Sequence, residues 1–194
     1  PSLCEYLRKY WSCDHVLAVD RTLLDWQHFD AARNRYNYVL AWKDDDALPS
    51  GVLGFIPTAR YDVELGNHNT LWLALWSVRE DVRAGGLGIQ LLNFALNTQP
   101  HEAFGTIGIS QATETLLRAY GCTAGVMNHY YMPAAHRTTF AIMKPPSAWA
   151  APADRAGVAL LPMTRDEIIG LEGQLLIGDR AAGNPVKSAV YFAN

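Results

Sequence analysis

The sequence predicts a mixed α/β fold in which helices flank one mixed β-sheet. Runs of apolar and β-branched residues, bounded by turn residues, alternate with stretches of helical periodicity over residues 1–144. Midway along this region, a predominantly apolar run at residues 70–78 enters a glycine-rich loop and then an amphipathic helix. Together these patterns predict the order β-β-β-loop-helix-β-helix-β-β for the main domain.

Each element of this domain has a local signal. Apolar residues at helical spacing predict helices, and apolar runs that end at Pro, Gly or Asp clusters predict strands. In order, we expect a helix at residues 1–11, a short strand at 15–18, a turn or short helix at 21–29, strands at 36–42, 51–57 and 70–78, a helix at 87–96, a strand at 104–109, a helix at 111–120 that Gly121 ends, and strands at 122–132 and 138–143. The run at 70–78 has the composition of a strand buried on both faces.

Residues 145–156 differ in composition from the rest of the chain. They contain three prolines and five alanines, which is typical of an extended linker between domains. Beyond it, we expect a strand at 157–161, a helix from 164 to 173 with Thr164 as its N-cap, and a strand at 188–193. Because so short a segment is too small to fold independently, we expect the natural chain to continue past Asn194.

Composition argues against several classes of protein. The chain has 194 residues, 49% of them hydrophobic, and a formal net charge of −3, which is typical of a globular domain and argues against a nucleic-acid partner. No run of about 18 apolar residues and no secretory signal is visible in the sequence, so we expect no membrane span and a cytoplasmic protein. Cys4, Cys13 and Cys122 lack metal-ligand spacing, so we expect reduced thiols and no metal site.

The segment from Val78 to Gly88 is the most informative part of the sequence. A strand, a loop rich in glycine and a helix follow one another there. The N–H groups at the start of a helix are unpaired and carry partial positive charge, so they suit phosphate groups, and Arg83 adds a cation. The segment lacks the Lys-Ser/Thr of a P-loop and the third glycine of a dinucleotide-binding motif. A plain strand-to-helix turn is the alternative.

Arg83-Ala84-Gly85-Gly86-Leu87-Gly88 resembles the acyl-CoA-binding motif Arg/Gln-x-x-Gly-x-Gly/Ala of the GNAT superfamily of N-acyltransferases. The order of elements over residues 1–144 is similar to that of the family, although Glu80 replaces a common Pro and Cys122 replaces the Phe of a Gly-Phe pair. The resemblance implies a GNAT-like sheet with splayed central parallel strands, in an acyl-CoA-binding domain at residues 1–144. We expect residues 157–194 to begin a second, truncated GNAT-like unit.

In that family, the loop binds the pyrophosphate of coenzyme A, and the flanking parallel strands hold its pantetheine arm. The resemblance therefore implies acetyl-CoA, or another acyl-CoA, as a co-substrate. The positions that match the coenzyme A site of the family are Val78, Arg83, Ala84, Gly85, Gly86, Leu87, Gly88, Ile89 and Ser110. Glu80 and Asp81 would repel phosphate, and we expect them to be solvated loop charges.

The sequence departs from the family at the groups that move protons. Leu117 stands where the family has a Tyr that protonates the thiolate, and the strand at residues 71–76 contains neither a carboxylate nor a His. His129, Tyr130 and Glu64 are the candidate catalytic residues instead, and His129 would titrate near neutral pH. A hydrogen-bonded strand His, a packed Tyr and a solvated loop carboxylate are the structural alternatives.

These residues are consistent with three functions. The first is an enzyme that transfers an acyl group, acetyl in the simplest case, to the amine of a small molecule such as an amino sugar. Trp72 and Trp76, expected on one face of a strand, either pack in the core or line the pocket for that amine. The alternatives are a non-catalytic GNAT-like module of a larger protein and a tandem aminoacyl or peptidyl transferase. Besides the amine, a second domain or a homodimer is the expected partner.

Overall fold

The computed structural model describes residues 2–43, 45–128, 161–171 and 187–193 of the chain. It divides into two compact units, one formed by Pro1–Gly108 with Thr164–Asn194 and the other by Ile109–Met163. Among the described residues, no helix combines the length and the apolar content that are needed to cross a membrane.

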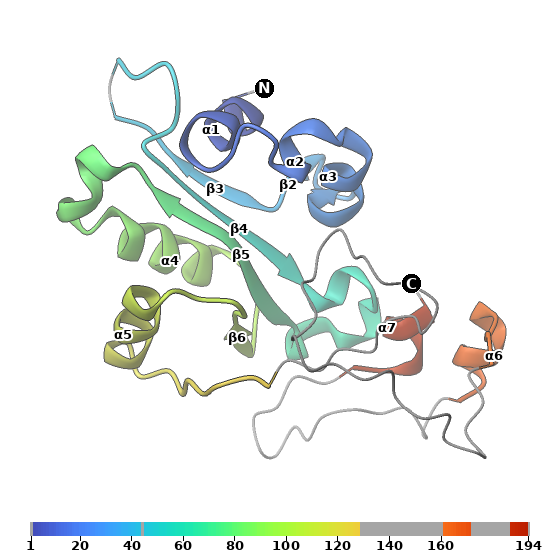
Figure 1. The fold of residues 1–194 in the computed structure, drawn as a ribbon. Coiled ribbons are helices and arrows are strands. Elements are labelled where there is room, and N and C mark those ends of the chain that lie inside the picture. Colours follow the sequence, from blue (N-terminus) through green and yellow to red (C-terminus); the bar gives the residue numbers. More distant parts are fainter. Residues whose placement is uncertain (1, 44, 129–160, 172–186, 194) are drawn as a thin grey trace, which may run out of the picture. The chain divides into compact units, whose positions relative to one another are not determined.

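A four-stranded mixed sheet forms the centre of the first unit (Figure 1). Its strands are β3 (Tyr38–Ala41), β4 (Gly51–Pro57), β5 (Thr70–Val78) and β6 (Ala103–Gly105), in that spatial order. β3 and β5 are both antiparallel to β4, which lies between them, and β6 is parallel to β5. The predicted fold class is therefore confirmed, and the strands expected at 51–57 and 70–78 have the predicted bounds.

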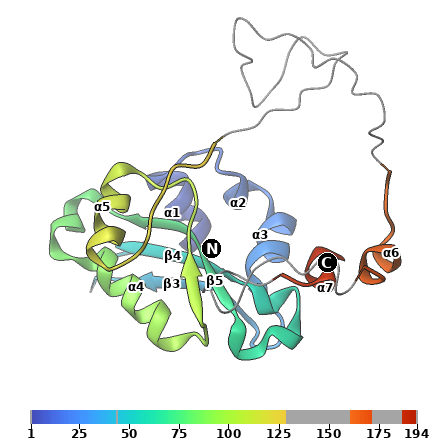
Figure 2. The ribbon, with the colours of Figure 1, turned by 90° about the horizontal axis from the view of Figure 1, so that it is seen from below.

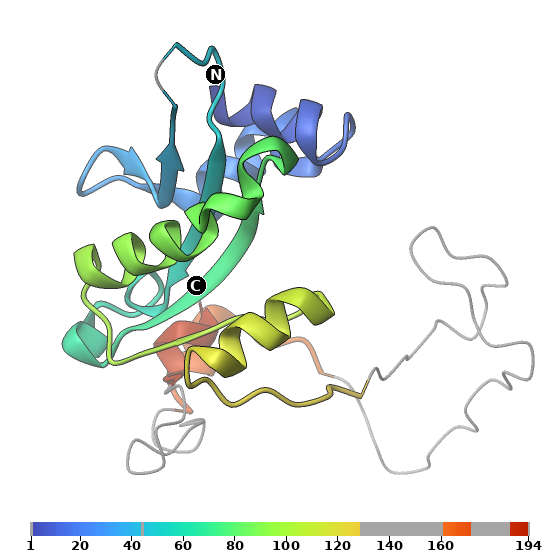
Figure 3. The same ribbon diagram turned by 90° about the vertical axis from the view of Figure 1, so that its left-hand side faces the viewer.

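Helices cover both faces of this sheet (Figures 2 and 3). The helices α1 (Ser2–Tyr10), α2 (Val16–Val19) and α3 (Arg21–His28) share an apolar core with Val52 of β4. The helix α4 (Leu87–Thr98) lies on the opposite face, where a Cβ on Gly51 would come within 3.0 Å of Leu91. Consecutive residues of a strand point to opposite faces. Val52 therefore faces α1, α2 and α3, and Gly51 faces α4 on the other side of the sheet.

Short helical turns and a small hairpin connect these elements. A two-stranded hairpin of β1 (Phe29–Asp30) and β2 (Arg35–Tyr36) follows α3. The 3-10 helices are η1 (Thr58–Arg60), η2 (Val63–His68) and η3 (Glu80–Gly85), which lie between β4 and β5 and between β5 and α4. The second unit contains α5 (Gln111–Ala119), and the C-terminal part of the first contains α6 (Arg165–Ile169) and α7 (Ala189–Ala193).

Two expected strands are helices in the structure. Residues 16–19 form α2, because His15 accepts a hydrogen bond from the Leu17 N–H at 3.2 Å and so caps a helix. Residues 189–193 form α7. Both segments are short apolar runs, in which the helical and the strand periodicity give the same pattern.

The strands expected after β5 are shorter or lie outside the described residues. The strand expected at 104–109 covers Ala103–Gly105 only, because the chain turns at Gly108, whose φ is +68°. Residues 122–128 contain no strand, and the remainder of the run expected at 122–132 is outside the described residues. So are the strand at 138–143, the linker at 145–156 and nearly all of the strand at 157–161.

The C-terminal segment confirms one predicted cap. Thr164 accepts a hydrogen bond from the Glu167 N–H, and the Glu167 carboxylate accepts one from the Thr164 N–H, which is a capping box at the start of α6. Residues 164–194 group with residues 1–108 in the compact units. The expectation that residues 157–194 begin a second GNAT-like unit stays a prediction.

Candidate functional site

The loop between β5 and α4 contains most of the predicted coenzyme A positions. β5 ends at Val78, η3 spans Glu80–Gly85, and Gly86 precedes the first turn of α4. Gly86 has a φ of +72°, a left-handed conformation that glycine adopts without strain. It is the N-cap of α4, and because it has no side chain it leaves the first N–H groups of the helix uncapped. These N–H groups are therefore available to an anion.

Open space surrounds the loop. A Cβ on Gly85 or Gly86 would meet no other atom within 4 Å, whereas a Cβ on Gly88 would lie 3.5 Å from Trp76 Nε1. Arg83 is exposed, and its Nη2 lies 3.4 Å from the Val78 carbonyl oxygen, so its charge is held beside the end of β5. The loop thus combines room, uncapped N–H groups and one cation, which are the requirements of a phosphate site.

Arg79 neutralises one of the two acidic residues that the sequence places in this loop. Its guanidinium pairs with Asp81 at 2.6 Å and with Asp46, from the β3–β4 connection, at 2.9 Å. The nearby guanidinium lowers the pKa of the Asp81 carboxyl. Glu80 and Asp81 are both exposed, as expected of solvated loop charges, and the structure adds that Asp81 is ion-paired.

The two parallel strands separate partway along β5. Thr70, Leu71 and Trp72 pair with Ala103, Phe104 and Gly105, and β6 then ends while β5 continues to Val78. This separation is the splay expected of the central strands. Among the described residues, no strand pairs with the outer edge of β5 beyond Trp72, where the Thr106 hydroxyl donates to the Leu73 carbonyl at 3.3 Å, so the backbone groups beyond Leu73 on that edge can pair with an extended ligand.

A β-bulge at Leu75 accompanies the separation. The pairing of β4 with β5 shifts between Leu53, opposite Trp76, and Gly54, opposite Ala74, so that Leu75 is an extra residue with a φ of +52°. A bulge leaves the extra residue unpaired in the ladder and re-aims its backbone groups. The sequence contains no signal for this feature, because leucine is not a residue type that favours a positive φ.

The bulge also corrects the expectation for the two tryptophans. Trp72 pairs with Ile56 and Trp76 with Leu53, which are three residues apart on β4 and so lie on opposite faces. Trp76 contacts the start of α4 near Gly88, and Trp72 lies beside Gly105. Trp72 and Trp76 therefore do not share a face, because the bulge inserts one residue into the alternation.

The remaining predicted residues lie in the second unit or outside the described residues. Ser110 caps α5, and its Oγ accepts a hydrogen bond from the Thr113 N–H at 3.2 Å. Leu117, which replaces the usual Tyr, is buried in the structure. His129 and Tyr130 lie outside the described residues. Their catalytic roles, and the role of Ser110 beside the pantetheine arm, stay predictions.

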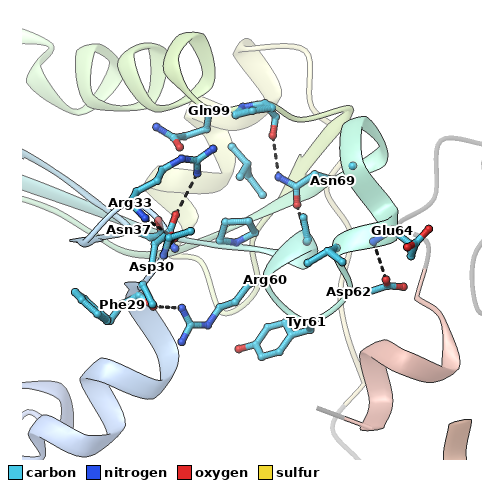
Figure 4. Close-up of a pocket in the computed structure, with 18 of the residues that line it drawn as sticks. Phe29, Asp30, Arg33, Asn37, Arg60, Tyr61, Asp62, Glu64, Asn69 and Gln99 are labelled. Carbon is cyan, nitrogen blue, oxygen red and sulfur yellow. Dashed lines mark hydrogen bonds and ion pairs between the residues drawn. The ribbon is translucent and has the colours of Figure 1, made fainter.

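Glu64 lies at the other end of β5. It belongs to η2, which precedes the first residue of the strand, and its exposed side chain lines a cavity of about 890 Å³ (Figure 4). The glycine-rich loop follows the last residue of the same strand, about 25 Å away at roughly 3.3 Å per residue. Glu64 therefore lies far from the loop, and its role as a base stays a prediction.

No family model matches the chain, and no curated protein matches it. Among solved structures, it resembles a glucosamine-6-phosphate N-acetyltransferase from Arabidopsis thaliana, with 10% identity and a TM-score of 0.39 over 62% of this chain and 76% of that one. It also resembles an acetyltransferase from Trypanosoma brucei, with 15% identity and a TM-score of 0.44 over 67% and 89%. Both neighbours are named as acetyltransferases.

Proposed function

We propose that the chain is an acyl-CoA-dependent N-acyltransferase, with acetyl-CoA as the first donor to test and the amine of a small molecule as the acceptor. One arrangement carries the proposal: β5 separates from its parallel neighbour and then enters the glycine-rich loop at the start of α4. The free strand edge suits the amide-containing pantetheine arm, and the loop suits the pyrophosphate.

Specific groups of the chain would hold the donor. The first N–H groups of α4, at Leu87, Gly88 and Ile89, would bind the pyrophosphate, and Arg83 would add a charge-assisted contact. The absence of side chains at Gly85 and Gly86 gives the phosphates close access to the backbone. Bound acyl-CoA supplies an activated thioester.

The bulge contributes to transfer by orienting backbone groups. The Leu75 N–H is outside the ladder between β4 and β5, in the stretch where β5 has left β6. A backbone N–H in this position would donate a hydrogen bond to an oxyanion that develops on the acyl carbonyl. Because residues 71–76 of β5 contain no ionisable side chain, the proton of the attacking amine must go to water or to a residue beyond β5, such as His129.

A non-catalytic acyl-CoA-binding module is the second candidate. The observation in its favour is Leu117, which has replaced the proton-donating Tyr of the family and cannot protonate a thiolate. Such a module would bind acyl-CoA and release no thiol.

Thiol release tests the two candidates together. The full chain is incubated with acetyl-CoA and one amine at a time, including glucosamine 6-phosphate, spermidine and an aryl amine, and the free thiol of coenzyme A is followed by colour reaction. The enzyme proposal predicts release that depends on the amine, with the acetylated amine identified by mass. Binding without release for every amine would support the module. No binding of acetyl-, propionyl- or longer acyl-CoA would contradict both.

A further inference from the structure

A second site is indicated by the cavity at the Thr70 end of β5. This cavity, of about 890 Å³, is lined by the end of α3, the β1–β2 hairpin, η1, η2 and the end of α4, all within one compact unit (Figure 4). Its volume is within the range of small-molecule sites in proteins. Because the cavity and the glycine-rich loop lie at opposite ends of β5, this inference does not depend on the proposed acyl transfer.

Asp62 presents a buried carboxylate without a cation. It is 4% exposed, its Oδ1 accepts the Glu64 N–H at 3.0 Å, and its Oδ2 accepts the Ser188 hydroxyl. No Lys, Arg or His within the described part of the chain forms an ion pair with it. Lys187, next to Ser188, instead places its Nζ over the rings of Trp72 and Tyr191. An unpaired buried carboxylate is costly, and a cationic ligand would remove that cost.

The basic side chains that line the cavity are already engaged. Arg60 donates to the backbone carbonyls of Asp25, Trp26 and Phe29 at the end of α3. Arg33 pairs with Asp30 at 3.1 Å. An anionic ligand would therefore meet no uncommitted cation on this wall, whereas a cationic one would meet the carboxylates of Asp62 and Glu64.

Aromatic rings complete the lining. Trp26 and Tyr61 both face the cavity, and their ring centroids are 6.4 Å apart. Aromatic faces attract cations and also pack against flat apolar groups. We propose that this cavity binds an organic ammonium ion with an aromatic body, whose N–H groups donate to Asp62.

Tyramine and two matched compounds test the charge requirement. Tyramine, 4-ethylphenol and 3-(4-hydroxyphenyl)propionate share a ring and a two-carbon chain but are cationic, neutral and anionic at pH 7. Calorimetry on the full chain, without acyl-CoA, should give one tyramine site, with binding at least tenfold tighter than that of 4-ethylphenol and none of the acid. Binding of the acid as tightly as tyramine, or no tyramine binding at all, would overturn the proposal.

Variants separate a ligand site from a structural cluster. Asp62→Asn keeps the shape and the acceptor for the Glu64 N–H, and should weaken tyramine binding at least tenfold. Glu102→Gln, which removes a carboxylate paired with His68 outside the cavity, is the control and should bind normally. Unchanged binding by folded Asp62→Asn would contradict the assignment.

Discussion

Arg79 holds both carboxylate oxygens of Asp81, with Nε 3.0 Å from Oδ1 and Nη2 2.6 Å from Oδ2. The same guanidinium contacts Asp46 and lies 5.7 Å from the ring centre of Tyr10 in α1. A planar bidentate pair of this kind is stronger and more directional than a single contact. The pair therefore fixes the start of the loop and offsets a negative charge that would otherwise face the phosphates of a bound acyl-CoA.

Removal of Arg79 should weaken acyl-CoA binding through the charge that it leaves behind. Arg79→Ala frees the Asp81 carboxylate, and a like charge near the phosphates should reduce affinity for acetyl-CoA roughly threefold to tenfold at low salt. The double variant Arg79→Ala/Asp81→Asn should recover most of that loss, as measured by calorimetry. Equal affinities of the single and the double variant would show that Asp81 has no effect on the site.

The bulge at Leu75 should reverse the usual order of glycine and alanine in a strand. Glycine normally destabilises a strand interior relative to alanine, but at a φ of +52° an alanine is strained and glycine is not. We expect Leu75→Gly to have a free energy of unfolding about 1 kcal/mol higher than that of Leu75→Ala. Urea denaturation of both variants measures the difference, and a more stable Leu75→Ala would contradict the bulge.

The stability of the protein should fall on acidification because of His28. This side chain is fully buried, and burial lowers its pKa to about 4 from an ordinary value of 6.5. Between pH 6.5 and pH 4, the unfolded chain binds a proton at His28 that the folded chain does not bind. The free energy of unfolding therefore falls as the pH decreases below 6.5, and at pH 4 it is lower by about 3 kcal/mol. Above pH 6.5, His28 should have no effect on the pH dependence.

Denaturation at several pH values checks this dependence. His28→Phe removes the titrating ring from its packing against Tyr38, so its stability should fall less steeply between pH 6.5 and 4 than that of the wild type. His68→Gln, which removes an exposed histidine, should keep most of the wild-type slope. If His28→Phe and the wild type have the same slope, His28 is protonated in the folded protein.

Local patterns in the sequence predicted the centre of the fold. The bounds of β4 and β5 agree with the structure because each strand is a continuous apolar run that ends at a clear turn signal. The start of α4 was predicted because Gly86 and Gly88, which are typical of a turn, come just before apolar residues at helical spacing, Leu91, Leu92 and Ala95. Segments of four to six residues, as in α2 and α7, were too short for periodicity to separate helix from strand.

Features that arise from pairing between distant segments could not be predicted. The bulge at Leu75 depends on the register of β4 against β5, and it reverses the face of Trp76 relative to Trp72. The cavity is lined by residues from different elements, such as Trp26 of α3 and Asp62 before η2, and neither residue has a motif around it. A buried side chain without a partner is recognised only when the structure shows what surrounds it.

The central claim is that the loop before α4 binds the pyrophosphate of an acyl-CoA, and calorimetry with acetyl-CoA tests it most directly. Gly85→Trp and Gly125→Trp are a matched pair, because at both positions an added Cβ meets nothing within 4 Å and the backbone does not require glycine. Both variants should therefore fold like the wild type. We predict that Gly85→Trp loses acetyl-CoA binding and that Gly125→Trp retains it. Wild-type affinity in folded Gly85→Trp would contradict the account.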